Sequence, residues 1–372
     1  MKNLINFFKK ETVLCIAAIL ALVSVFFVPP SLEYINYMDF RVLALLFCLM
    51  LVVSGLRSIG VFGYLGSSLL KKASNTRQLT LLLTGLCFFS SMFITNDVAL
   101  ITFVPFAIML LSMAGQEKLM IPIVVLQTVA ANLGSMLTPI GNPQNLYLYS
   151  SFDLTMGQFL CYMFPLTMLS LFLLIAAAIL LPKKDLQFRS EEDTPAPKRM
   201  TLILYLLLFL ICLCCVLRIL PWQAMLGILV AGVFLIDKTI FRSVDYYLLL
   251  TFVCFFLFIG NMERIPAVSR FLIEIISGRE LLLGTLLSQC ISNVPAAILL
   301  SGFTDRVRSL LYGVNIGGLG TLIASLASVI SFKSYSNAKN AKKGSYIMTF
   351  TIVNIAFLVI LYIAAFLLLR YQ

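Results

Sequence analysis

Apolar runs of about 20 residues, the length that an α-helix needs to cross a bilayer, recur along the chain and constrain its fold more than any other feature. The 372 residues are 61% hydrophobic and 12% charged, whereas a soluble domain is about a quarter charged. The short alternating segments of a membrane β-barrel are absent from the sequence. We therefore expect an all-α polytopic membrane protein with about nine crossings, two of them broken helices, and two re-entrant hairpins, which are described below.

The placement of the charges indicates the orientation of the chain. The net charge is +11, but the basic residues fall in short loops between apolar runs, which is typical of a membrane protein and not of a nucleic-acid-binding face. With the N-terminus in the cytoplasm, every Lys falls on the cytoplasmic side. The first apolar run, Val13–Val28, resembles a signal peptide, but no small-residue cleavage site follows it, so we expect a retained helix. The chain is therefore expected in the plasma (inner) membrane, with the lipid bilayer and no nucleic acid as its partner.

Two apolar segments carry a polar tip near their centre and are expected to be re-entrant hairpins. Residues 79–113 are apolar throughout except around the tip Thr95–Asp97, and residues 281–303 are interrupted at Ser292–Asn293. A single helix over residues 79–113 would overshoot the membrane. We therefore expect each hairpin to consist of two half-length arms that meet at the tip.

Two further apolar segments, residues 121–149 and residues 310–332, are interrupted in the middle and are expected to be broken helices. The first interruption is NLGSMLTPIGNPQN (Asn132–Asn145), whose prolines cannot both continue a helix, and the second is NIGGLGTLIAS (Asn315–Ser325). Irregular backbone is tolerated inside a membrane only where protein covers it or where it lines a cavity. Both breaks are therefore candidate functional sites.

The hairpin and the broken helix occur in the same order in both halves of the chain, which predicts two inverted repeats. Asp39 before one apolar run matches Asp245 before another, and Asn132 matches Asn315. The expected division is a first repeat over residues 1–182 with its hairpin entering from the cytoplasm, a cytoplasmic linker over residues 183–199, and a linking helix with the second repeat over residues 200–372, whose hairpin enters from outside. Inverted repeats whose broken helices meet near the midplane are typical of secondary transporters.

The broken segments have the chemistry of an ion site. Helix N-termini attract anions, and freed carbonyls with Asn and Thr oxygens can coordinate Na⁺. Asp97 is the one carboxylate deep in an expected membrane segment, which indicates function. Its role is open between a Na⁺ ligand, a protonatable coupling site and a structural group at the tip. Since the chain has no His, a coupled proton would need a carboxylate.

The candidate site residues come from all four polar segments, and the alternative is that they only support close helix packing. The residues assigned to substrate binding are Thr95, Asn96, Ser292, Asn293, Asn142, Asn145 and Ser325. The residues assigned to ion coupling are Asp97, Asn132, Gly134, Thr138, Gly141, Asn315, Gly317 and Thr321. The candidate Na⁺ ligands are Asn96, Asn132, Asn293 and Asn315.

These motifs resemble those of the ion transporter superfamily, which includes sodium-coupled di- and tricarboxylate symporters, citrate permeases, arsenite permeases and one class of sodium/proton antiporters. The resemblance covers Asp39 to Phe332 and rests on TNDVALITFVPF (95–106), ANLGSMLTPIGNPQNL (131–146), SNVPAAILL (292–300) and NIGGLGTLIAS (315–325). It implies a scaffold domain and a transport domain, an elevator-like movement and, in many members, a homodimer. In the carboxylate symporters each hairpin tip is Ser-Asn-Thr, whereas both tips of this chain lack the final Thr.

The expected function is ion-coupled secondary active transport of a small anion, a carboxylate or an oxyanion, driven by Na⁺ or H⁺. Asp97 is also compatible with a second hypothesis, a Na⁺/H⁺ antiporter. The Asn-Asp tip suggests a third hypothesis, an arsenite permease. An enzyme is not expected, because the chain lacks His and a cluster of catalytic acids. No cofactor is expected besides the coupling ion, since a zinc site at Cys212–Cys215 has no His to complete it.

Overall fold

The computed structural model describes residues 11–64, 73–185, 196–338 and 341–370. The described α-helices are α2 (Thr12–Val25), α3 (Phe40–Ser58), α5 (Thr76–Ile94), α6 (Asn96–Met113), α7 (Met120–Gly134), α8 (Pro143–Ser151), α9 (Met156–Leu180), α10 (Arg199–Val216), α11 (Trp222–Asp237), α12 (Tyr246–Glu263), α13 (Pro266–Ile276), α14 (Glu280–Ile291), α15 (Asn293–Ser301), α16 (Val307–Gly317), α17 (Leu326–Ser336) and α18 (Lys343–Arg370). The 3₁₀ turns are η1 (Leu32–Tyr37), η2 (Glu117–Leu119), η3 (Ser135–Leu137), η4 (Pro139–Gly141), η5 (Lys238–Ser243) and η6 (Leu322–Ala324).

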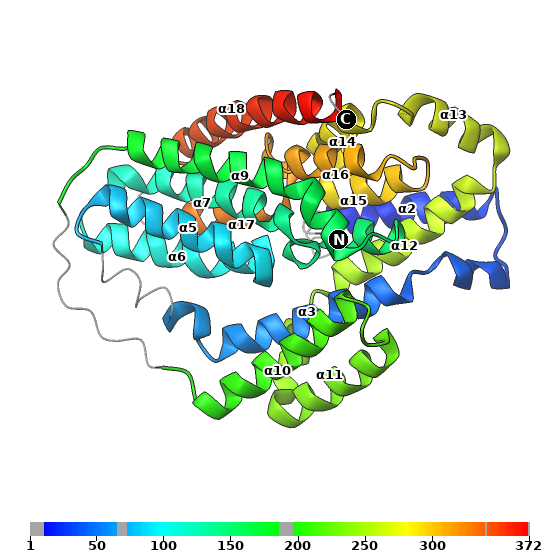
Figure 1. Ribbon diagram of the computed structural model, residues 1–372, viewed down its shortest axis with the longest axis horizontal. Helices are drawn as coiled ribbons and strands as arrows, with labels where there is room; N and C mark the ends of the chain where they lie inside the picture. The colour runs from blue at the N-terminus through cyan, green and yellow to red at the C-terminus, as the bar shows by residue number, and fades with distance from the viewer. Residues whose placement is uncertain (1–10, 65–72, 186–195, 339–340, 371–372) are drawn as a thin grey trace, which may run out of the picture.

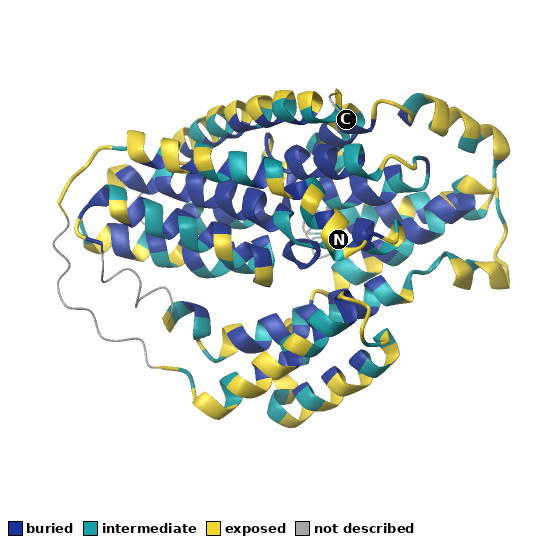
Figure 2. Cartoon of the chain, in the orientation of Figure 1, coloured by how far each residue is buried: buried dark blue, intermediate teal, exposed yellow. Residues whose placement is uncertain are grey.

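The expected all-α polytopic fold is confirmed. Within the described residues, nine helices are long and apolar enough to cross a membrane. Their outward faces carry exposed apolar side chains, most evidently on α9, α10, α11 and α18 (Figure 2). Such faces suit contact with lipid, and the chain is an integral membrane protein. The linker expected over residues 183–199 lies mostly outside the described residues.

The helices fall into two groups in space (Figure 1). In one group α3, α10 and α11 pack on one another, and α12 packs on α2 and also touches α3. In the other group α5, α6, α7 and α17 lie at one end of the group and α14, α15 and α16 at its other end, so the two hairpins approach each other from opposite ends of the group (Figure 1). The groups meet where α8 and α15 contact α3 and α12.

The backbone is the same at matched residues of the two halves. Asp39 and Asp245 both have φ −81° and ψ 84°, and each caps its helix by accepting a hydrogen bond, from Val42 N at 2.9 Å and from Leu248 N at 3.0 Å. Asp at such an N-cap satisfies a backbone N–H that the helix leaves unpaired. The matching found in the sequence therefore extends to local conformation.

The two hairpins differ in arm length. Two arms meet at each tip, as expected, and each arm takes up about half of the apolar segment in the first hairpin. Its arms α5 and α6 have 19 and 18 residues, whereas α14 and α15 have 12 and 9. Helix α5 begins before the apolar run, because the Asn75 side chain caps it by accepting from Gln78 N at 3.1 Å. Arg77 Nε then donates to Leu181 O at 2.9 Å. Polar residues thus lengthen an arm whose extent the sequence analysis had placed by hydropathy.

Both broken helices occur as expected. In the first, α7 ends at Gly134, two 3₁₀ turns follow, and α8 begins at Pro143, whose fixed φ suits the first turn of a helix. In the second, α16 ends at Gly317 and α17 begins after η6. The residues before the new helices, Asn142 and Ser325, are both extended, with φ −156° and −143°.

Candidate functional site

The two hairpin tips have the same strained backbone. Thr95 has φ 68° and ψ 150°, and Ser292 has φ 75° and ψ 156°. This region costs a residue with a Cβ about 1–3 kcal/mol and is found mainly at functional sites. The turn makes Asn96 the first residue of α6 and Asn293 the first residue of α15, and both side chains are buried.

Asn132 joins the first half of the chain to the second. Its Oδ1 accepts from Asn96 Nδ2 and from Ser325 Oγ, both at 3.0 Å. Its Nδ2 donates to Gly318 O and to Ser328 Oγ, both at 3.4 Å. All four hydrogen bonds connect the end of α7 with a hairpin tip or with the break between α16 and α17.

Asn315 mirrors two of these four contacts, those to Ser325 and Ser328. Its Oδ1 accepts from Asn142 Nδ2 at 3.3 Å, and its Nδ2 donates to Asn145 Oδ1 at 2.7 Å. The sequence offset that pairs Asn132 with Asn315 also pairs Ser325 with Asn142 and Ser328 with Asn145. The hydrogen bonds between the two breaks therefore follow a pseudo-twofold relation.

The structure brings six of the predicted side chains into this network: Asn96, Asn132, Asn142, Asn145, Asn315 and Ser325. Thr138 and Thr321 instead hold backbone of the hairpins, through bonds to Met92 O and Gln289 O. Gly134, Gly141 and Gly317 allow neighbouring segments to pack closely on them, because a Cβ on any of the three would lie within 3.0 Å of a neighbouring atom.

A cavity of about 380 Å³, hereafter the tip cavity, lies against both hairpin tips. The first residues of four helices line it: Asn96 and Asp97 of α6, Pro143 and Gln144 of α8, Asn293, Val294 and Pro295 of α15, and Leu326 of α17 with the preceding Ser325. Free N–H groups at each helix N-terminus add up to about half a positive charge. Two halves of the chain thus direct four such termini at one space.

Charged side chains modify this positive field. Asp97 lines the tip cavity, and the residue at the matching position of the second tip, Val294, also lines it. Glu11, Asp245 and Lys333 also line it. Sequence analysis identified Asp97 alone, since Asp245 lies outside a membrane helix and only the folding of α12 beside the tips brings it to the cavity.

A metal site built from His, Cys, Asp and Glu side chains is not evident in the part of the chain that the structure describes. No group of three or more His, Cys, Asp and Glu side chains there is arranged to hold a metal ion. The side-chain oxygens of the candidate Na⁺ ligands differ in how many hydrogen bonds they accept. Asn132 Oδ1 accepts two hydrogen bonds and Asn96 Oδ1 accepts one from Asp97 N at 2.9 Å.

Three polar residues that contact the breaks were not predicted from the sequence: Ser135, Ser328 and Gln289. Ser135 Oγ accepts from Asn142 Nδ2 at 3.2 Å, Ser328 lies in the first turn of α17, and Gln289 lies on α14. The signal that could have found Ser328 is the repeat offset itself, which pairs it with Asn145.

Gln289 holds the second break together. Its Nε2 donates to Gly317 O at 2.8 Å and to Leu319 O at 2.9 Å, and its Oε1 accepts from Thr321 N at 2.9 Å. We expect Gln289→Leu to lower the free energy of unfolding by roughly 1–3 kcal/mol, because it leaves the backbone carbonyls of the buried Gly317 and Leu319 without this donor. Thermal unfolding of the purified protein in detergent measures this, with the exposed Gln223→Leu as the matched control. An unchanged melting temperature for Gln289→Leu would contradict the role.

Comparison with known proteins gives a consistent result. The sequence profile described as citrate transporter matches residues 5–306. An uncharacterized transporter of Methanocaldococcus jannaschii is 33% identical over 299 residues, which are 79% of this chain and 80% of the relative. The inner membrane protein YbiR of Escherichia coli is 32% identical over 293 residues, 77% of this chain and 78% of the relative. A silicon efflux transporter of Oryza sativa is 31% identical over 128 residues, 34% of this chain and 26% of that protein.

Proposed function

The chain belongs to the citrate transporter family, and on that basis we propose that it is an ion-coupled secondary active transporter of a small anion, a carboxylate or an oxyanion. That the chain is a membrane transporter rests on the family and on the relatives described above. We further propose the substrate class, the coupling by Na⁺ or H⁺ and an elevator-like movement. In it, α3, α10, α11 and α12 form the scaffold along which the hairpins and broken helices move.

The observation that carries the proposal is the convergence of four helix N-termini on the tip cavity. Together they supply N–H donors and partial positive charge, which favour an anion. The buried amides of Asn96 and Asn293 add further donors at the same place. A cavity of about 380 Å³ is large enough for a small organic acid or an oxyanion and lies within the usual size of ligand sites.

Asp97 supplies the coupling in this proposal. A fixed negative charge among the N-termini would repel an anionic substrate unless a cation or proton neutralises it. The anion then binds well only together with Na⁺ or H⁺, which is the requirement for symport.

A second candidate function is export of an uncharged oxyacid, as in an arsenite permease. The specific observation that favours it is that Asp97 and Asp245 both line the tip cavity, whereas Lys333 is the one cation among the described residues that line it. An uncharged substrate would not be repelled by them. The related rice protein carries the name silicon efflux transporter, which suits this alternative.

Uptake by proteoliposomes tests the proposal. We expect an inward Na⁺ or proton gradient to drive accumulation of at least one radiolabelled carboxylate or oxyanion, such as citrate, succinate, phosphate or sulfate. Liposomes without protein and liposomes without a gradient are the controls. Flux of arsenite or silicic acid only, with no anion transported, would replace the first candidate by the second.

Replacing Asp97 tests the coupling. We expect Asp97→Asn to abolish the dependence of transport on the ion gradient, because the amide keeps the shape of the side chain and removes its charge. The matched control is Asp237→Asn. Asp237 is partly exposed, caps η5 and does not line the tip cavity, and Asn can also serve as an N-cap. The measurement is initial uptake rate with and without the gradient. Gradient-driven transport that survives in Asp97→Asn excludes this residue as the coupling group, and loss of Na⁺-dependent proton movement without any anion flux would indicate a Na⁺/H⁺ antiporter.

A further inference from the structure

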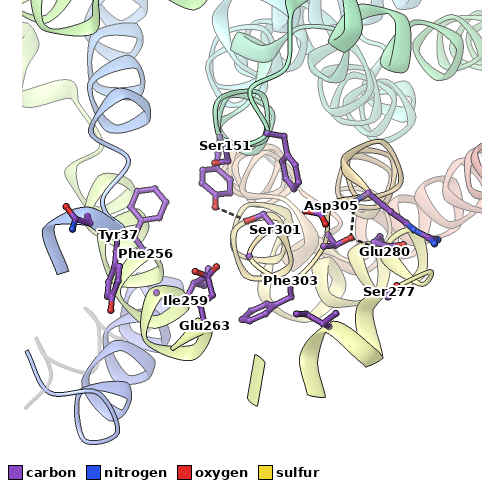
Figure 3. Close-up of a pocket in the computed structure, with 18 residues that line it drawn as sticks. Tyr37, Ser151, Phe256, Ile259, Glu263, Ser277, Glu280, Ser301, Phe303 and Asp305 are labelled. Carbon is purple, nitrogen blue, oxygen red and sulfur yellow. Dashed lines mark hydrogen bonds between the residues drawn. The ribbon is translucent and has the colours of Figure 1, made fainter. Parts of the chain in front are cut away.

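A second cavity, of about 640 Å³, lies on the far side of the contact between the two helix groups. Figure 3 shows Phe256, Ile259 and Glu263 of α12 facing it from one side, and Ser301 and Phe303 from the other. Its lining is mixed, with acidic, aromatic and hydroxyl side chains. None of the predicted site residues belongs to it.

Three helices contribute to both cavities, each with opposite ends. Helix α12 lines the tip cavity with Leu248 and Thr251 and the second cavity with Ile259 and Glu263. Helix α8 does so with Pro143 and Gln144 at its start and with Ser151 at its end, and α15 with Asn293 at its start and Ser301 at its end. The two cavities are therefore in line along the groove between α12 and the pair α8 and α15.

An aromatic cluster occupies the groove between the cavities. The ring centroid of Tyr147 on α8 lies 6.0 Å from that of Phe252 and 5.7 Å from that of Phe256, and the two Phe rings on α12 are 5.9 Å apart. All three side chains are buried. Tyr147 OH lies 2.8 Å from Ser301 Oγ of α15, so the cluster connects all three helices.

We propose that the two cavities are the two ends of one translocation path, and that the aromatic cluster of Tyr147, Phe252 and Phe256 is the seal that closes it in this state. The proposal rests on the transport function proposed above. Apolar constrictions in membrane pathways close by excluding water, so a cluster of rings without a charged group blocks ions and substrate without a tight plug. Helix α15 begins at the second tip, α8 follows the break of the first broken helix, and α12 belongs to the scaffold. Relative movement of the groups would therefore separate Tyr147 from the Phe rings.

The position of the seal also explains the small residues beside it. Gly302 follows α15, and a Cβ there would lie 2.5 Å from Glu263 Oε1 and 2.7 Å from Ile259 Cγ2. Close contact between α15 and α12 thus continues from the seal to the second cavity, along the surface on which the groups would slide.

A leak assay tests the seal without knowledge of the substrate. Phe256→Ser places a hydroxyl in the constriction and removes a ring, so water should enter it. We expect proteoliposomes with this variant to pass protons or Na⁺ down a gradient, in the absence of any substrate, about tenfold faster than the wild type, as expected when a dewetted constriction becomes wet. Entrapped pH-sensitive and Na⁺-sensitive dyes measure the two fluxes.

Two variants control for the substitution itself. Phe255→Ser buries the same hydroxyl one residue away on α12, at a side chain that lines neither cavity, and should leak like the wild type. Phe256→Leu keeps the position apolar and should restore the closed state. If Phe256→Ser does not purify as a monodisperse protein, Tyr147→Ser from the facing helix carries the same expectation.

The outcomes are distinct. Leak in Phe256→Ser but not in Phe255→Ser supports the seal. Equal leak in both variants, or no leak in Phe256→Ser and Tyr147→Ser, overturns it. Failure of the anion uptake experiment leaves the leak assay unaffected, because the leak needs neither a substrate nor coupling; the two proposals therefore fail separately.

Discussion

Gly134→Ala is expected to abolish transport and to destabilise the protein by about 3 kcal/mol or more, at the upper end of what overpacking costs. Gly134 ends α7 where this helix packs on α5. An added Cβ would lie 2.1 Å from Phe88 O and 2.7 Å from both the Phe88 carbonyl carbon and Ser91 Oγ. Two of these atoms are backbone, so relief requires α5 itself to shift, and with it the tip that presents Asn96.

Gly85→Ala is the matched control for this prediction. Gly85 lies on α5, and nothing comes within 4 Å of an added Cβ there. Ala is the better helix former, by up to about 1 kcal/mol, so the control should melt no lower than the wild type. Thermal unfolding in detergent and uptake by proteoliposomes measure both variants. A Gly134→Ala protein that melts and transports like Gly85→Ala would contradict the close approach of α5 and α7.

Asn132→Ala is the second substitution with a large expected effect. It removes the acceptor of Asn96 Nδ2 and Ser325 Oγ, and each buried donor left without a partner costs about 1–3 kcal/mol. It also frees the tip from the break between α16 and α17. Because a displacement of about 1 Å can lower a rate on the order of a hundredfold, we expect that loss in transport, provided that the tip positions the substrate.

Asn354→Ala separates this effect from the general cost of removing a buried amide. Asn354 on α18 is as buried as Asn132, but among the described residues its Nδ2 donates to Phe350 O alone, within its own helix, at 2.9 Å. Asn354→Ala should keep most of the transport activity. Asn132→Asp should be intermediate, since the carboxylate still accepts hydrogen bonds and no longer donates to Gly318 O and Ser328 Oγ. Equal loss in Asn132→Ala and Asn354→Ala would argue against a special role of the network.

Much of the fold could be predicted from local patterns. The breaks were located from Pro, Gly and Asn inside apolar runs, and the structure interrupts α7–α8 and α16–α17 at those residues. The pairing of Asp39 with Asp245 was visible because a capping residue stands at a constant place relative to its helix. The start of the first hairpin was predicted less accurately, because a hydropathy pattern does not report the cap and the carbonyl contact that extend α5 toward its N-terminus.

The candidate site could be predicted as a set of residues and not as an arrangement. Asn132 and Asn315 were identified together, yet their cross-repeat partners follow from how the two breaks interlock. Asp245 and Gln289 were not assigned to the site. A residue at the edge of a span, such as Asp245, has the same local pattern whether it faces a cavity or not, and the backbone partners of Gln289 lie on another segment of the chain.

The sequence by itself determined that the chain is a helical membrane protein with two broken segments in repeated order. These properties depend on the length of apolar runs and on residues that break helices, which act within a few neighbours along the chain. Only the tertiary structure decided that four helix N-termini meet at one cavity, that Asn132 and Asn315 exchange partners across the repeats, and that Tyr147 meets Phe252 and Phe256 between two cavities. Those contacts join distant residues, and they depend on how each helix is rotated and packed against the others.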